Sequence, residues 1–462
     1  MSETVSINND ITSIKFLKRH KIISPRLSYW INIQRCWMCV IVIVSHITPA
    51  SYYEKSVVTT LIPHPFVAHG KAAVRMYFVF AAIFSMHSVQ NLYEIHQNSI
   101  KQFTKAIIYQ YIKRYFQTHG ILLIMGLGYA PFIYWVFGEN GRDVYYQPWK
   151  QYNRYWLTWF LPVYLPWRDE NVHSISGSAW FNQQLANNEF FFYCFYYLGY
   201  FMKIVIKKQY VWSIIFLTLI VISSHLLEKF APGCKYLRNY SFGVVCYWFR
   251  FMLTSTKYGQ IIIKFSYSKS NKCLVLRWII TIIFIYLWLF MCRIPIIVGV
   301  ADIPQWAHIP YSMFLLFDMI PFPRFTPFWQ TIINEMSRLL MPIYILHYAF
   351  LEQAAPKNFP YITALNQQIE NNHSWINAFS SWIYLLIFGM LSYPLWFIQR
   401  PLEILPVWVK LIVEKQLVKN IKTFKINIIL SFIGLTTGAI LAVLVQSDVF
   451  GHDFVGKPPL QK

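Results

Sequence analysis

Apolar residues gather along the chain into runs of about 18 to 22 positions, separated by shorter polar stretches. A membrane-crossing helix needs about 20 such residues, because each residue adds ~1.5 Å and the hydrocarbon core is ~30 Å thick. The pattern therefore predicts an all-α, polytopic membrane protein. We expect eleven spans, near residues 36–53, 73–92, 117–137, 179–202, 210–227, 239–256, 278–299, 308–323, 339–355, 377–399 and 426–446.

The eighth predicted span, near 308–323, is the weakest. Pro310, Pro321 and Pro323 crowd this short apolar run, which also contains Asp318. Proline removes a backbone donor and interrupts a helix, so this stretch is the candidate for a broken or re-entrant helix. If this stretch does not cross the membrane, every later span runs in the direction opposite to the one predicted.

Composition agrees with a membrane protein, since 56% of the residues are hydrophobic and only 13% are charged, against about 25% charged in soluble chains. The formal charge of +22 does not point to nucleic acid, because the basic residues form short clusters between apolar runs rather than one patch. The 7 cysteines and 13 histidines lack the spacing of a disulfide framework or a zinc site. We expect no bound metal.

The basic clusters also predict the orientation of the chain. With a cytoplasmic N-terminus, the inside segments hold 26 of the 41 Lys and Arg residues, as the positive-inside rule favours. No small-residue cleavage site follows the first apolar run, so we expect that run to stay in the membrane. The chain then divides into a cytoplasmic leader (1–31), a membrane domain (32–401), a basic cytoplasmic segment (402–425), an eleventh membrane helix (426–446) and a short outer tail (447–462).

The first apolar run carries a cation at its start, Arg35, and an imidazole eleven residues later, His46. Eleven helical steps end about 20° beyond three full turns, so both side chains project from nearly one face, about 16 Å apart along the axis. For Arg35 alone, anchoring at the membrane boundary is the simpler explanation. For the pair we favour a shared cavity, because an ionisable side chain within a span is costly and histidine titrates near neutral pH, which suits a general base.

This spacing resembles the acyltransferase family 3 membrane proteins, whose first helix carries an Arg, ten residues and then an essential His. Later, Met341-Pro-Ile-Tyr344-Ile-Leu-His347 resembles the family's Pro-x-Tyr-x-x-His helix, and Arg400-Pro401 stands where the family often has Glu-Arg/Lys-Pro. The resemblance covers about residues 30–401. It implies a ten-helix acyltransferase bundle, to which this chain adds an eleventh C-terminal membrane helix.

Two further stretches match the family only in part. Residues 76–84 look like its Phe-rich second helix, which normally ends in Ser-Gly, but here Ala81 and Ala82 replace those two residues. Residues 111–116 are similar to its basic entry to helix three, where an Arg-x-x-Arg pattern is thought to contact acyl-CoA. Only Arg114 aligns well.

The resemblance implies O-acylation of a carbohydrate. An acyl group, acetyl by default, would pass from cytoplasmic acyl-CoA to a hydroxyl of an extracytoplasmic carbohydrate such as O-antigen or capsule, in a bacterial inner membrane. Arg35, Lys113 and Arg114 would hold the phosphates of the donor, and His46 would take the proton of the attacking hydroxyl. Acyl-CoA, the carbohydrate acceptor and the lipid bilayer are the expected partners, and no permanently bound cofactor is expected.

Four other residues are expected near the acceptor or behind the catalytic pair: His347 and Tyr344 on the ninth span, and Glu189 and Trp180 on the fourth. A site residue and a hydrogen-bonded structural histidine are equally good interpretations of His347. Glu189 has two interpretations, orienting a histidine or pairing with Arg250. We favour the second, in which the ion pair only compensates the cost of burying the charges.

Two other functions stay open. A transporter or polymerase for lipid-linked glycans would also be polytopic, aromatic and basic. It would not require Arg35 and His46 on one face of a helix. The sequence also shows no internal duplication of the kind found in inverted-repeat transporters. A catalytically inactive relative that only binds acyl-CoA or glycan is the other, suggested by Ala81-Ala82 and the incomplete basic motif. Acyl transfer from labelled acetyl-CoA separates the three.

Overall fold

The computed structural model describes residues 23–47, 70–124, 180–206, 208–230, 236–253, 256–298, 308–321 and 326–348, with positions 389, 390 and 393. Within these residues the chain forms ten α-helices and no strand, so the all-α prediction is confirmed for them. The helices are α2 (Pro25–Ile47), α4 (Gly70–Ile95), α5 (Ile100–Ile124), α9 (Trp180–Val205), α10 (Gln209–Phe230), α11 (Leu237–Leu253), α12 (Lys257–Tyr267), α13 (Asn271–Val298), α14 (His308–Leu316) and α15 (Pro327–Tyr348).

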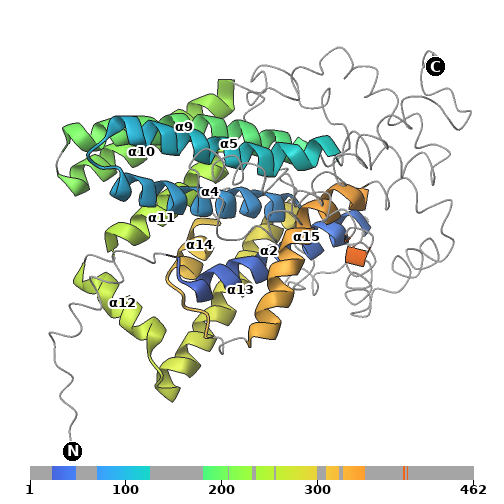
Figure 1. Cartoon of the computed structure of the whole chain (residues 1–462). Coiled ribbons are helices and arrows are strands. Elements are labelled where there is room, and N and C mark those ends of the chain that lie inside the picture. The colour runs from blue at the N-terminus through green and yellow to red at the C-terminus, as the bar shows by residue number, and fades with distance from the viewer. Residues whose placement is uncertain are drawn as a thin grey trace, which may run out of the picture.

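Helix α4 is the central element. It packs against α11, α2, α5, α9 and α14, and Figure 1 shows it between a layer of α5, α9 and α10 and a group formed by α2, α13, α14 and α15. Its apolar side chains are buried around the helix, as expected for a helix inside a bundle. The position of α4 therefore decides how the two groups face each other.

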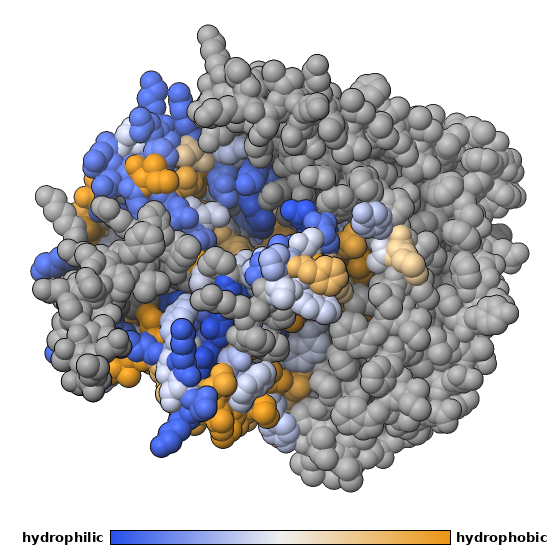
Figure 2. All heavy atoms as spheres, turned by 60° about the horizontal axis from the view of Figure 1, so that its bottom comes forward, coloured by the Kyte–Doolittle hydropathy of each residue, from blue (hydrophilic) through white to orange (hydrophobic). Residues whose placement is uncertain are grey.

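Three of the described helices are long and apolar enough to cross a membrane: Gly70–Ile95, Tyr210–Phe230 and Asn271–Met291. The second and third expose many large apolar side chains, such as Ile214, Ile222 and Ile282. Figure 2 shows such hydrophobic patches beside hydrophilic ones on one face of the molecule. An apolar surface of this kind fits contact with lipid, which is consistent with a membrane protein. The predicted spans near 377–399 and 426–446 lie outside the described residues, apart from three positions in the first.

Several helices begin earlier than the apolar runs predict. Helix α2 begins at Pro25 rather than near 36, because the Ser24 hydroxyl accepts a hydrogen bond from the Leu27 N–H at 3.0 Å and proline suits the first helical position. Helix α5 begins at Ile100 rather than near 117, after Ser99. The predicted cytoplasmic leader and loop are therefore partly helical.

The weakest predicted span is helical only in its first part. Helix α14 ends at Leu316 after nine residues, which extend about 14 Å and fall short of a ~30 Å hydrocarbon core. The chain then turns at Asp318, whose φ of 56° is unusual for a residue other than glycine. The Asp318 N–H donates to the Leu315 carbonyl at 2.9 Å and closes the turn.

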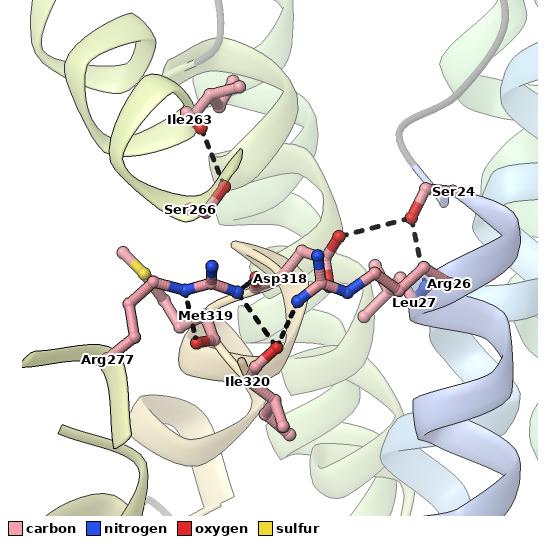
Figure 3. A network of polar contacts seen from close by, with 9 residues as sticks. All are labelled: Ser24, Arg26, Leu27, Ile263, Ser266, Arg277, Asp318, Met319 and Ile320. Atoms are coloured by element: carbon pink, nitrogen blue, oxygen red, sulfur yellow. Dashed lines mark hydrogen bonds and ion pairs between the residues drawn. The ribbon is translucent and has the colours of Figure 1, made fainter. Parts of the chain in front are cut away.

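Two arginines cap the carbonyl end of α14 (Figure 3). Arg277 of α13 donates from Nε to the Met319 carbonyl at 3.1 Å and from Nη2 to the Ile320 carbonyl at 3.0 Å. Arg26 of α2 also donates to the Ile320 carbonyl, and its Nε lies 3.5 Å from the buried Asp318 carboxylate. We call Arg26, Arg277 and Asp318 the arginine cap. It satisfies backbone carbonyl groups of the turn that follows α14, at Met319 and Ile320.

The arginine cap and two further contacts bring four helix ends together. Helices α2 and α15 run parallel, because Tyr29 donates to Gln330 at 3.1 Å and Asn32 donates to Asn334 at 3.4 Å. The first turns of α2, α13 and α15 and the last turn of α14 thus meet at one end of the bundle. In the predicted topology, where successive spans run in opposite directions, these same four helix ends also lie on one side of the membrane.

Replacing Arg277 with Met should lower the stability of the detergent-purified protein by about 2 kcal/mol. The carbonyl oxygens of Met319 and Ile320 lose charge-assisted hydrogen bonds, which are worth about 1.5–3 kcal/mol. Thermal unfolding, followed by a fluorescence probe, measures the change. Lys272→Met, at an exposed position one turn earlier on α13, is the matched control and should behave like the unsubstituted protein. Equal stability of the two variants would contradict a stabilising cap.

Candidate functional site

A cavity of about 540 Å³ opens between α2, α4, α5, α9 and α15. Part of its wall is polar and basic, and the rest is aromatic and aliphatic. Its lining residues are Ser28, Asn32, Arg35, Tyr77, Phe80, Ala81, Phe84, Arg114, Phe181, Leu185, Asn334, Ser337, Arg338, Leu340, Met341 and Tyr344. Three residues predicted from the sequence, Arg35, Arg114 and Tyr344, therefore meet around one space although they lie far apart in the chain.

Arg35 is held on the α2 side of this cavity. Its Nη1 donates to the Asn32 side-chain oxygen at 3.4 Å, and the Tyr77 hydroxyl of α4 donates to the Arg35 carbonyl at 2.5 Å. The second contact pins the backbone of α2 against α4. Two helices therefore hold the backbone that carries this guanidinium, and the guanidinium itself contacts Asn32 of its own helix.

Arg114 of α5 is held by Glu189 of α9. The Arg114 Nε donates to Glu189 Oε1 at 3.1 Å, and its Nη2 makes an ion pair with the same oxygen. The favoured pairing of Glu189 with Arg250 is therefore wrong. Arg250 lies instead over the Phe317 ring, 6.0 Å from its centroid. Sequence gives no sign of the observed pair, because α5 and α9 are adjacent only in the folded bundle.

The Glu189 carboxylate is almost completely buried, with 2% of its side chain exposed, whereas 24% of the Arg114 side chain is exposed. Glu189 does not line the cavity. It thus lies behind Arg114, fixes the direction of its guanidinium and compensates the cost of burying the charge.

Tyr344 and His347 lie on one turn of α15. The Tyr344 ring lines the cavity and contacts Phe181, with centroids 5.4 Å apart. His347 is buried, its Nδ1 lies 2.5 Å from the Tyr344 carbonyl, and it is not among the lining residues. The structure thus brings Tyr344, but not His347, to the cavity.

Three other predicted site residues have no described contact with the cavity. His46 follows Arg35 by eleven positions on the same continuous helix α2, but its side chain lies outside the described residues. The same holds for Trp180, the first residue of α9. The Lys113 side chain is half-buried on α5 and does not line the cavity.

Four lining residues are not predicted from the sequence: Tyr77 of α4 and Asn334, Ser337 and Arg338 of α15. No motif marks Tyr77, and the predicted ninth span begins near 339, after the three residues of α15. Arg338 pairs with Glu335 at 2.9 Å, but both side chains are well exposed, at 50% and 40%, so the pair holds Arg338 weakly. An amphipathic pattern over Pro327–Tyr348 was the available signal.

Among the described residues, every charged side chain of the cavity wall is basic. Arg35, Arg114 and Arg338 line it, and Glu189 and Glu335 pair with Arg114 and Arg338 from outside the described lining. Arginine presents a planar fork of donors that matches phosphate and carboxylate groups. The polar part of the cavity is therefore suited to an anion, and the wall of Phe80, Phe84, Phe181 and other apolar residues to an uncharged portion of the same ligand.

Two adjacent alanines of α4 have different surroundings. Ala81 lines the cavity, whereas Ala82 is fully buried and lies where α4 meets α11. A Cβ added to Gly243 of α11 would come within 2.7 Å of the Ala82 Cβ and would also overlap the Val79 carbonyl. Small residues on both sides allow this close approach.

Replacing Glu189 with Gln should lower the stability of the protein by about 3 kcal/mol, since removing one partner of a buried ion pair leaves the other charge uncompensated. Glu335→Gln breaks an exposed pair and should cost less than about 1 kcal/mol. Thermal unfolding in detergent measures both. A Glu189 variant as stable as the Glu335 variant would show that the buried pair does not hold α5 against α9.

Comparisons of this chain with models of protein families, with curated proteins and with solved structures found no match. An assignment of function therefore depends on the cavity and on the motifs that line it.

Proposed function

We propose that the chain is an integral membrane O-acyltransferase that binds acyl-CoA in the cavity described above. One observation carries the proposal: three arginines from three helices line a single cavity of about 540 Å³, and the described part of its lining contains no carboxylate. This volume is within the usual range of about 300–1,000 Å³ for small-molecule sites. The resemblance of the Arg35–His46 spacing to acyltransferase family 3 supplies the chemistry.

The donor fits both parts of the cavity wall. Coenzyme A carries a diphosphate and a 3′-phosphate, for which Arg35, Arg114 and Arg338 provide charge-assisted donors. Its pantetheine arm is largely uncharged and suits the apolar residues of the lining. In this scheme Lys113 adds positive charge on α5 without contacting the cavity directly.

In the proposed reaction, the His46 imidazole takes the proton of an acceptor hydroxyl as its oxygen attacks the carbonyl carbon of the thioester. The new C–O bond forms as the C–S bond breaks. The CoA thiolate leaves and receives a proton, so the products are the ester and free CoA. Three helical turns separate His46 from Arg35, which places the reacting carbonyl away from the phosphates, as the length of the pantetheine arm requires.

The remaining features of the proposal follow from the motif resemblance and the charge pattern. We infer ten membrane passages in the acyltransferase domain, the eighth of them only partly helical because α14 is short, and an eleventh beyond it, with a cytoplasmic N-terminus in a bacterial inner membrane. The acceptor is an extracytoplasmic carbohydrate such as O-antigen or capsule, and acetyl is the default acyl group. Tyr344 lines the cavity and is the residue that we assign to the acceptor side, whereas His347 and Trp180 stay predictions for that side.

Replacing His46 with Ala should reduce acyl transfer from labelled acetyl-CoA in isolated membranes by about 100-fold or more, the usual contribution of a general base. His225→Ala, at an exposed position on α10, is the control and should retain transfer. Full activity of the His46 variant would remove this residue from the mechanism. Glycan movement without acylation would support a transporter, and CoA binding without turnover an inactive relative.

Replacing Arg338 with Gln should weaken CoA binding by the purified protein about tenfold, which corresponds to the loss of ~1.4 kcal/mol from one charge-assisted hydrogen bond. Isothermal titration with CoA measures the dissociation constant. Lys105→Gln removes an exposed positive charge from α5 outside the cavity and controls for general electrostatic attraction. An unchanged dissociation constant for the Arg338 variant would exclude this cavity as the phosphate site.

A further inference from the structure

A short helix that the apolar runs did not predict, α12, connects α11 to α13. It contains the eleven residues Lys257–Tyr267 and begins at Thr256, whose side chain accepts a hydrogen bond from the Gly259 N–H. Among the described helices it has its main contacts with α11 and α13 alone, and it lies away from the layer of α5, α9 and α10 (Figure 1). It is close to the arginine cap, as Ser266 and Ile263 in Figure 3 show.

Helix α12 has three distinct faces. Residues seven apart share a face of a helix, because seven steps of 100° end about 20° from two full turns. Gly259 and Ser266 are buried and form the face towards the bundle. Tyr258 and Ile261 form an apolar face, with 78% and 62% of their surfaces exposed.

The third face is basic. Lys257 and Lys264 are seven residues apart, both exposed, and lie beside the apolar face. Lys269 and Lys272 follow in the connection to α13 and its first turn and are also exposed. No Asp or Glu occurs anywhere from 256 to 277. This stretch therefore has an uncompensated positive charge next to exposed apolar side chains.

The neighbouring helix indicates what covers the apolar face. Helix α13 begins four residues after α12 and is one of the three helices apolar enough to cross a membrane. Its first turns already expose Leu274, Val275, Trp278 and Ile279. The exposed apolar surface of α12 is thus followed along the chain by the surface of α13 that is suited to lipid. The lysines lie at the start of that surface, where lipid headgroups are expected.

We propose that α12 lies in the plane of the membrane interface, with Tyr258 and Ile261 among the acyl chains and Lys257, Lys264, Lys269 and Lys272 bound to the phosphates of anionic phospholipids. A helix with an apolar face and flanking lysines is typical of such interfacial binding, and clustered lysines attract anionic headgroups. The inference uses only the membrane character of the chain and is independent of the acyltransferase proposal.

The depth of α12 is tested on the full-length protein in nanodiscs. An environment-sensitive fluorescent amino acid is placed at position 261 and, as the matched control, at position 264 on the basic face. Brominated lipids should quench the fluorophore at 261 several-fold more strongly than at 264, and aqueous iodide should do the reverse. Equal quenching by iodide at both positions would overturn the proposal, as would protection of position 261 from both quenchers, which would mean that protein covers it.

The choice of lipid is tested by exchanging all four lysines for Gln and, as the matched control, for Arg. After purification from nanodiscs that mix phosphatidylcholine with phosphatidylglycerol, mass spectrometry counts the retained lipids. The Gln variant should retain several-fold less phosphatidylglycerol, whereas the Arg variant should retain the normal amount. Unchanged retention by the Gln variant would overturn the proposal, and so would displacement of the lipid by inorganic phosphate, which would identify a free-phosphate site. If the Gln variant does not fold, the quenching measurement on the unaltered lysines still decides.

Discussion

The chain turns within the bundle after α14, and the carbonyl groups of Met319 and Ile320 in that turn are the constraint on which the surrounding arrangement depends. In an apolar environment each unsatisfied carbonyl is costly, so this turn needs donors from other elements. Arg277 and Arg26 supply them, from α13 and α2, and Asp318 balances part of their charge. The turn after α14 is thus contacted by both α13 and α2, and this contact fixes the position of the start of α2.

Fixing α2 also fixes the cavity. Beyond the arginine cap, α2 is tied to α15 through Tyr29 and Asn32 and to α4 through its contact with Tyr77, so the segment that carries Arg35 is held on three sides. Arg114 is fixed independently, through its buried carboxylate partner on α9. Only one of the three arginines around the cavity is therefore neutralised by a buried acid, and the positive charge that remains is available to an anionic ligand.

Apolar runs predicted where α4, α9, α10 and α11 lie to within three residues, because lipid or core contact along most of a helix leaves a continuous apolar signal. Helix α13 was also predicted, but it begins seven residues before the predicted start. The same signal does not reveal helix starts that are built from polar residues, such as the turn after Ser24. It also does not reveal the amphipathic helix α12 or the first half of α15. Arg35, Arg114 and Tyr344 were predicted as site residues and do line one cavity. Arg338 was missed with the start of its helix, and the partner of Glu189 was wrong, because contacts across 75 residues depend on helix packing that no local pattern encodes.

The second of the two adjacent alanines on α4, Ala82, has a role in helix packing. Where α4 crosses α11, the room available is set by the sum of the two facing side chains, not by either alone. Ala82 adds a methyl group on α4, and Gly243 on α11 has none, so the helices still approach closely. Small residues on both helices thus share the contact. Ala81, which lines the cavity, is the alanine of the pair that a bound ligand would touch, and its methyl group adds to the apolar part of the cavity wall.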